Sequence, residues 1–174
     1  MIRKVLTVFS RSLALSALLA FSLPAVVSAQ DVGMTVGTVA KPVKIEDLDG
    51  KPVDLATYIG KRPVLLEFWA TWCPVCEALS PKLHAASRKY QGKADILTIA
   101  VAVNETPRSI KRHMTKHTMP GPVLWDVDGR ATRAFMAPST SYVVILDRKG
   151  RVVYTGSGED QNIDAALAKA IAAR

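Results

Sequence analysis

The sequence predicts an α/β protein with a mixed central sheet flanked by helices, an N-terminal hairpin and an inserted αβ segment. Short apolar runs of strand length, such as residues 64–69 and 96–103, alternate with stretches of helical spacing, such as 74–90. Two further strands near the carboxyl terminus are separated by the three-residue link 148–150, which suits a hairpin turn. Strand–helix–strand units followed by a hairpin and a helix favour a sandwich built on a mixed sheet.

The first half of the chain supplies the hairpin and the two most apolar strands. Residues 43–55 flank an Asp-Gly pair at 49–50, which favours a tight hairpin turn. Residues 64–69 and 96–103 are mostly apolar, as expected for strands buried on both faces. Between these strands, the stretch 74–90 places three apolar residues along one helical face: Leu79, Leu83 and Ala86.

The second half continues the alternation with shorter elements. They are a polar helix at 106–117, a strand at 123–125, a turn at 128–129, a helix at 131–135, strands at 142–146 and 152–155, and an alanine-rich helix at 162–173. No internal repeat or low-complexity stretch divides this order. The sequence therefore predicts one domain over residues 43–174.

Composition agrees with a single globular domain plus a short appendage. The 174 residues are 49% apolar and 22% charged, which disfavours a disordered chain. The 2 cysteines cannot form the framework of a disulfide-stabilised miniprotein, and a domain of this size needs no disulfide for its stability. We therefore expect the cysteines to serve chemistry.

Residues 1–29 have the order of a secretory signal peptide. A basic start is followed by the apolar run 13–23 and then by small residues before Gln30. The apolar run is shorter than the about 20 residues of a membrane span. We expect cleavage after Ala29, with retention as a membrane anchor as the alternative, and a loose segment over 30–42. Because residues 1–29 hold three basic and no acidic residues, the formal charge of +8 falls to +5 after cleavage.

Thiol chemistry is expected at Cys73-Pro74-Val75-Cys76, a segment that follows a predicted strand and begins a predicted helix. Unpaired amides and the helix dipole at a helix N-terminus favour a cysteine as its thiolate. Cys76 lies one turn further along, on the same side, and can close a disulfide with Cys73. Pro74 suits the first helical turn, where its missing N–H would have no partner. The pair can attack a disulfide, form a mixed disulfide and resolve it.

The stretch from Glu67 to Cys76, EFWATWCPVC, resembles the active-site segment of thioredoxin-fold proteins. The preceding hairpin and the segment 102–135 resemble the TlpA-like branch of exported thiol–disulfide oxidoreductases. The resemblance covers about residues 37–172. It implies a thioredoxin fold, no bound cofactor, and dithiol–disulfide exchange with other proteins.

The resemblance also assigns roles to individual residues. Cys73 matches the attacking cysteine and Cys76 the resolving cysteine. Glu67 matches the buried acid beneath the resolving cysteine; a desolvated carboxyl group has a raised pKa and can take the proton of Cys76. The alternative is a Glu67 side chain that faces solvent at the end of its strand. The residues that support the motif are Trp72, Pro74, Val75 and Pro81, the last matching a proline that bends the active-site helix.

One position departs from the family pattern. The family places a cis-proline before the strand of the last hairpin, where the neighbouring backbone pairs with substrate. That position falls on Ser141, and the nearest proline is Pro138. Either a longer loop brings Pro138 into this role or Ser141 replaces the proline, so these two residues mark the expected substrate-docking loop. In this fold the proline keeps metal ions from the thiols, and its loss would allow a metal-binding interpretation.

The alternative function is a metal-binding chaperone module that holds copper or haem iron through Cys73 and Cys76. His113 and His117 are four residues apart and can share a helix face, but the basic residues around them favour a solvated surface. No metal site is therefore expected, and a structural zinc site would need four ligands. The basic stretch 108–116 is expected to be a solvated helix face, with steering of an acidic partner or an anionic membrane as the alternative.

Two other classes are excluded on composition and motif. Nucleic acid is not an expected partner, because the chain lacks a stripe of interleaved aromatic and basic residues. A peroxidase is excluded because Trp-Ala-Thr-Trp precedes Cys73, in place of the proline and threonine or serine of peroxiredoxins.

The expected function is reduction of disulfides in exported clients, such as apocytochromes in cytochrome c biogenesis or copper-site proteins. Pro74 and Val75 add no charge between the cysteines, so the thiolate is stabilised mainly by helix-terminus amides. We expect a reduction potential below roughly −190 mV, nearer to thioredoxin at about −270 mV than to DsbA at about −120 mV. We also expect a membrane electron donor and a monomeric protein. The expected location is periplasmic or otherwise extracytoplasmic.

Overall fold

The computed structural model describes residues 33–173. The predicted signal peptide and the first residues of the loose segment lie outside this range. Within 33–173, no helix is long and apolar enough to cross a membrane.

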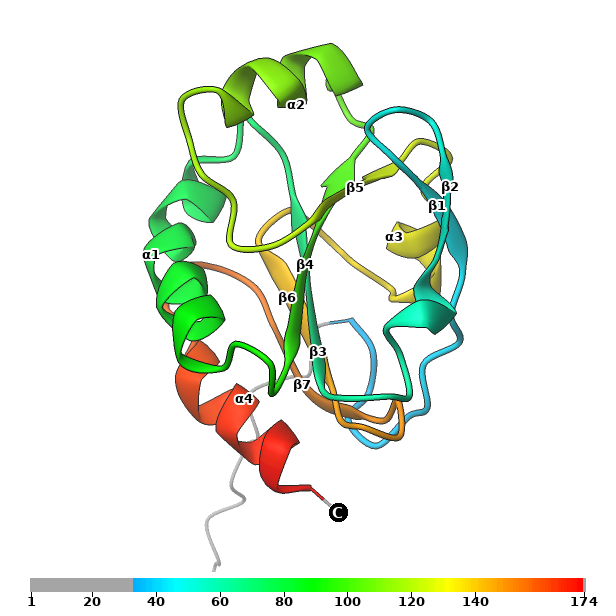
Figure 1. The fold of residues 1–174 in the computed structure, drawn as a ribbon, viewed down its shortest axis with the longest axis vertical. Coiled ribbons are helices and arrows are strands. Elements are labelled where there is room, and N and C mark those ends of the chain that lie inside the picture. Colours follow the sequence, from blue (N-terminus) through cyan, green and yellow to red (C-terminus); the bar gives the residue numbers. More distant parts are fainter. Residues whose placement is uncertain (1–32, 174) are drawn as a thin grey trace, which may run out of the picture.

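A mixed sheet forms the centre of the described part of the chain (Figure 1). Its seven strands within 33–173 stand in the order β2-β1-β5-β4-β3-β6-β7. β3, β4 and β5 are parallel, whereas β1 pairs antiparallel with β5 and β6 pairs antiparallel with β3. The strands are β1 Lys44–Asp47, β2 Pro52–Asp54, β3 Val64–Trp69, β4 Asp95–Val101, β5 Val123–Asp126, β6 Tyr142–Leu146 and β7 Val152–Gly156. The predicted α/β class with a mixed sheet is confirmed.

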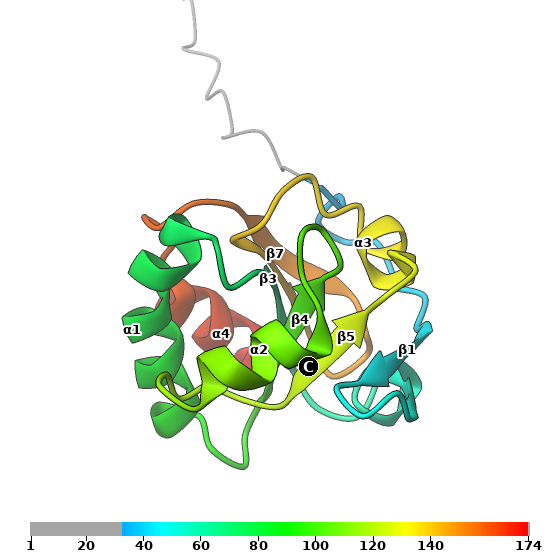
Figure 2. The ribbon, with the colours of Figure 1, turned by 90° about the horizontal axis from the view of Figure 1, so that it is seen from above.

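Helices cover both faces of the sheet and one of its ends. α1 (Pro74–Lys89) and α4 (Ile163–Ala172) lie together on one face, and α3 (Arg130–Ala134) lies on the other (Figure 1). α2 (Pro107–Met114) lies at the end of the sheet toward which the parallel strands run (Figure 2). The sequence analysis missed a single 3₁₀ turn at Leu55–Thr57.

Local capping fixes where α2 begins and ends. The Thr106 side chain accepts the N–H of Ser109 at 3.1 Å, and the Ser109 hydroxyl accepts the N–H of Thr106 at 2.9 Å, which completes a capping box. The helix ends at Met114, where the His113 carbonyl accepts the N–H of both Lys116 and His117. The predicted helix over 106–117 was therefore too long at its carboxyl end.

Side chains of β3 alternate between two apolar cores. Val64, Leu66 and Phe68 belong to the core on the α3 side, whereas Leu65 packs with the apolar stripes of α1 and α4. Because alternate side chains of a strand share a face, Glu67 follows Leu65 toward the α1 side of the sheet. This places a carboxyl group beneath the start of α1.

Candidate active site

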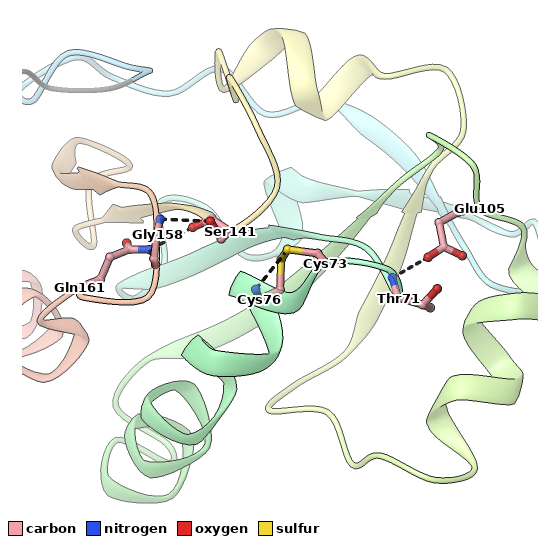
Figure 3. The surroundings of a disulfide bond; sticks show 7 residues. All are labelled: Thr71, Cys73, Cys76, Glu105, Ser141, Gly158 and Gln161. Atoms are coloured by element: carbon pink, nitrogen blue, oxygen red, sulfur yellow. Dashed lines mark hydrogen bonds between the residues drawn. A yellow bond between two sulfur atoms is a disulfide. The ribbon is translucent and has the colours of Figure 1, made fainter.

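Cys73 and Cys76 form a disulfide where β3 has ended and α1 begins (Figure 3). Cys73 is the N-cap of α1, and its Sγ accepts the N–H of Cys76 at 3.1 Å. Pro74 occupies the first turn, as predicted. Cys73 is 6% exposed and Cys76 only 1%, so an incoming disulfide reaches Cys73 more easily. The geometry fits an attacking Cys73 and a resolving Cys76, and these roles remain predictions.

The loop between β4 and α2 holds the turn that precedes the cysteines. The Glu105 carboxylate accepts the N–H of Thr71 and the hydroxyl of Ser109, the latter at 2.6 Å. The indole N–H of Trp72 donates to the Val103 carbonyl at 2.8 Å. Glu105 is buried, so a single carboxylate joins the active-site turn to the start of α2. Sequence analysis missed Glu105, because no local pattern links it to a partner 34 positions away.

Ser141 stands directly before β6, on the opposite side of the disulfide from Thr71 in the view of Figure 3. Its N–H donates to the Phe68 carbonyl at 2.8 Å, which anchors the loop to the end of β3. Its hydroxyl accepts the N–H of Gly158 at 3.0 Å, and its carbonyl accepts the Gln161 amide at 2.9 Å. Ser141 has a φ of 62°, a left-handed conformation that is uncommon outside glycine. Within 33–173 there is no cis peptide bond.

Pro138 lies three residues earlier, in an apolar groove beside the active-site turn. The groove has a volume of about 420 Å³. Its walls include the exposed apolar side chains of Trp72, Val103 and Val127. Two other motif residues are also at the surface: Val75 is exposed in the first turn of α1, and Pro81 is exposed within that helix.

Glu67 is 2% exposed, which rules out the alternative of a solvent-facing side chain. Burial raises the pKa of its carboxyl group to about 8. Its Oε1 atom makes no hydrogen bond with any residue of the described range. Glu67, Cys73 and Cys76 line the same small cavity, with a volume of about 50 Å³. A buried carboxyl group with a raised pKa, which lines one cavity with both cysteines, has the properties of a proton acceptor.

His113 and His117 line the same cavity, which the sequence analysis did not anticipate. Their rings stack with centroids 4.2 Å apart, and the His113 ring meets Trp69 edge-on at 5.3 Å. Burial and the neighbouring His117 lower the pKa of His113. No group of three or more His, Cys, Asp or Glu side chains within 33–173 is arranged to hold a metal ion.

A dithiol–disulfide pair that caps the helix after a central parallel strand defines the class of thioredoxin-fold thiol–disulfide oxidoreductases. Residues 32–171 match the family described as Redoxin. The chain therefore belongs to the Redoxin family and, within it, to the TlpA-like thioredoxin-fold branch. It is a thiol–disulfide oxidoreductase.

Individual relatives agree with this assignment. The thiol-disulfide oxidoreductase ResA of Bacillus thuringiensis subsp. konkukian (strain 97-27) is 29% identical over 126 residues, which cover 72% of each chain. A structure assigned as a thiol:disulfide interchange protein DsbE from Chlorobium tepidum has a TM-score of 0.70 at 19% identity, over 79% of this chain and 99% of that one. The exposed lipoprotein thioredoxin Etrx1 of Streptococcus pneumoniae has a TM-score of 0.62 at 24% identity, over 75% of this chain and 98% of that one. The two structures bear on the fold alone.

Proposed function

We propose that this oxidoreductase reduces disulfides in exported client proteins. In this proposal Cys73 attacks the client, Cys76 resolves the mixed disulfide, and Glu67 accepts the proton of Cys76. The observation that carries the proposal is the shared cavity, which is lined by a buried carboxyl group and by both cysteines, Cys76 being the more deeply buried of the two.

The first step uses the position of Cys73 at the helix N-terminus. Its thiolate attacks one sulfur of the client disulfide, a bond forms between that sulfur and Cys73 Sγ, and the client disulfide breaks. The other client sulfur leaves as a thiolate and takes a proton from water. The N–H of Cys76, which donates to Cys73 Sγ in the disulfide, is placed to stabilise negative charge on that sulfur.

The second step needs a base inside the protein. The Cys76 thiol gives its proton to the Glu67 carboxylate and attacks Cys73 Sγ. The mixed disulfide breaks, and the second client sulfur leaves as a thiolate that is protonated by water. The client has then gained two electrons as a dithiol, and the protein holds the Cys73–Cys76 disulfide seen in the structure. A dithiol of a membrane electron donor returns the protein to its reduced form.

The apolar groove beside Trp72 is the proposed docking site for the client segment around its disulfide. An exposed apolar groove binds apolar side chains, which an unfolded or extended client segment exposes and the polar surface of a folded client does not. Pro138 contributes to the groove, whereas Ser141 anchors the loop through its three hydrogen bonds. In this arrangement Pro138 contacts clients and Ser141 positions the loop.

We propose an extracytoplasmic location, which the signal-like order of residues 1–29 supports. A role in the maturation of cytochromes c or copper-site proteins would suit a reductase in this location.

The reducing direction rests on the surroundings of the cysteines. Both are nearly buried, and a buried site disfavours the charged thiolates of the reduced form relative to the neutral disulfide. Pro74 and Val75 bring no positive charge to offset this effect. A stable disulfide corresponds to a low reduction potential, and we expect a value below roughly −190 mV.

Equilibration of the folded chain with a glutathione redox series tests the direction. A value near about −120 mV would make the protein a disulfide donor and reverse the proposal. Alkylation of the reduced protein at neutral pH tests the cysteine roles, because Cys73 should be labelled first. Metal analysis of the same sample tests the chaperone alternative, which a stoichiometric copper or iron content would favour.

A further inference from the structure

Glu67 lies in a site that limits how its proton can leave. The carboxyl group is buried and has no hydrogen-bond partner at Oε1 within 33–173, and it faces the cavity of about 50 Å³. If Glu67 takes a proton from Cys76 in each cycle, that proton must reach bulk water before the next cycle. The cavity is large enough for a few water molecules, and its wall therefore decides where the proton can go.

Two imidazoles form part of that wall. His113 and His117 line the inner cavity together with Glu67, and they also line an open cleft of about 360 Å³ on the surface. The outer cleft contains Arg112 and Lys116 but neither cysteine nor Glu67. His113 is partly buried and His117 is exposed, so the pair leads stepwise from the inner cavity to solvent.

The contacts of the pair hold its rings in place. The His113 ring meets the buried Trp69 edge-on, and the His117 ring stacks on His113 with the centroids 4.2 Å apart. Trp69 is the last residue of β3, which also carries Glu67. The strand that positions the carboxyl group therefore also supports the imidazoles.

We propose that His113 and His117 form the outer half of a proton path between Glu67 and bulk water. The inference rests on the proposed role of Glu67 as proton acceptor. Because the pKa of Glu67 is about 8, its carboxyl group is mostly protonated at neutral pH and must lose this proton before it can accept the proton of Cys76. Before each resolution step, the Glu67 carboxyl group gives its proton through cavity water to the His113 imidazole, which passes it to His117 and to water in the outer cleft. The transfer leaves Glu67 as the carboxylate that accepts the proton of Cys76. The same path runs backward when the disulfide is reduced.

The charges around His113 allow it to accept a proton transiently. At neutral pH the lowered pKa favours the neutral imidazole, which can act as an acceptor. Burial and His117 disfavour the charged ring, whereas two nearby carboxylates favour it. Several titratable and charged groups face His113 or line its two cavities. They are Glu67 from β3, Glu77 from α1, Glu105 from the loop before α2, Arg112, Lys116 and His117 from its own segment and, in the reduced protein, the thiols of Cys73 and Cys76.

Stopped-flow mixing of the reduced protein with the aromatic disulfide dithiobis(nitrobenzoate) separates the two chemical steps. The attack of Cys73 releases one coloured thiolate, and resolution by Cys76 releases a second one. We expect His113→Ala to slow the second phase about tenfold at neutral pH, at the low end of the contribution of proton transfer to catalysis. The first phase should stay within about twofold, because the neutral His113 adds no charge at Cys73.

Three further samples make the result specific. Free imidazole should restore the second phase of His113→Ala, because the cavity left by the ring can admit it. Arg108→Gln, which removes an exposed positive charge from α2 outside both cavities, should leave both phases unchanged. In a Glu67→Gln background, His113→Ala should slow the second phase no further, because the path then lacks its inner end.

The outcomes separate this inference from the proposed function. An unchanged second phase in His113→Ala, together with a slowed one in Glu67→Gln, overturns the proton path and leaves the role of Glu67 standing. A slowed phase that imidazole does not restore, or that adds to the effect of Glu67→Gln, assigns His113 a structural role and also overturns the path. An unchanged second phase in Glu67→Gln overturns both. If His113→Ala slows both phases, the substitution has disturbed the site as a whole, and His113→Gln replaces it. An unchanged second phase in His113→Gln, or a slowed one that adds to the effect of Glu67→Gln, then overturns the path.

Discussion

The active-site turn contributes to a small polar cavity, through Thr71, and to a wider apolar groove, through Trp72. The inner cavity, about 50 Å³, is lined by titratable groups and by both cysteines. The groove beside Trp72, about 420 Å³, is wider and mostly apolar, and neither cysteine lines it. Under the proposed function, proton transfer and client contact would therefore use different walls of one short turn. Variants on either wall should therefore change one property and leave the other intact.

The two cysteines carry the sulfur chemistry itself, so their variants should have the largest effects. Cys76→Ser should still attack a client through Cys73 and then stop, which leaves a stable mixed disulfide. Cys73→Ser should form none. Both variants should lose more than about a thousandfold in turnover, as expected when a nucleophile is removed. Turnover of a protein disulfide, with mass spectrometry of the trapped adduct, measures both results, and an adduct on Cys76 would contradict the assignment.

The buried Glu67 in the inner cavity should make the free energy of unfolding depend on pH. The pKa of Glu67 is about 8 in the folded protein against a usual 4.5, so the folded state binds more protons than the unfolded state between these values. The free energy of unfolding should therefore fall as pH rises through this window, by at most about 5 kcal/mol. Glu67→Gln should remove this component and stabilise the protein at pH above about 8.

Urea denaturation on both sides of this pH window measures the effect. The matched control is Glu159→Gln, which neutralises an exposed carboxylate and should preserve the wild-type pH dependence. An identical pH dependence in wild type and Glu67→Gln would show that the carboxyl group is not desolvated.

The groove should respond only when the substrate is a protein. Val127→Asp places a charge on an apolar wall, and we expect kcat/KM for a protein client to fall about tenfold, equivalent to about 1.4 kcal/mol. The rate with a small aromatic disulfide should not change. Val36→Asp, at another exposed valine that does not line the groove, is the control. Equal losses on both substrates would place Val127 outside client recognition.

Ser141 should affect stability alone, because its three hydrogen bonds anchor the loop before β6 and it lines neither the cavity nor the groove. Ser141→Ala removes the acceptor of the Gly158 N–H and retains the left-handed backbone, and it should cost about 1–2 kcal/mol of stability. Ser141→Gly loses the same hydrogen bond but relieves the backbone, and it should cost less. Chemical denaturation of both variants checks the order, and a glycine variant less stable than the alanine variant would contradict it.

The sequence predicted those parts of the site that depend on neighbours along the chain. β3, the helix that starts after Cys73, and the pairing of Cys73 with Cys76 follow from strand hydrophobicity and from one turn of helix. The burial of Glu67 was expected from the resemblance, and its two-residue offset from Leu65 places it on the α1 side. Such features need no knowledge of the distant parts of the fold.

The parts that could not be predicted depend on pairs far apart in sequence. Glu105 contacts Thr71 across 34 positions, and Gln161 contacts Ser141 across 20. His113 and His117 were expected on a solvated face, because basic residues surround them in the sequence. The helix ends at Met114, and the turn after it brings His117 back over His113. No local pattern indicates that this turn faces the cavity beneath Cys76.

The closeness of Cys73 and Cys76 in sequence also has a consequence for the unfolded chain. A crosslink restrains an unfolded chain more strongly when it closes a longer loop, and this one spans a separation of 3 residues. In the chain-entropy model such a short loop contributes about 2 kcal/mol, less than half the value for a loop of about 100 residues. Most of the stability must then come from the two apolar cores on the faces of the sheet. The protein can therefore gain and lose two electrons in every cycle while the rest of the chain stays folded.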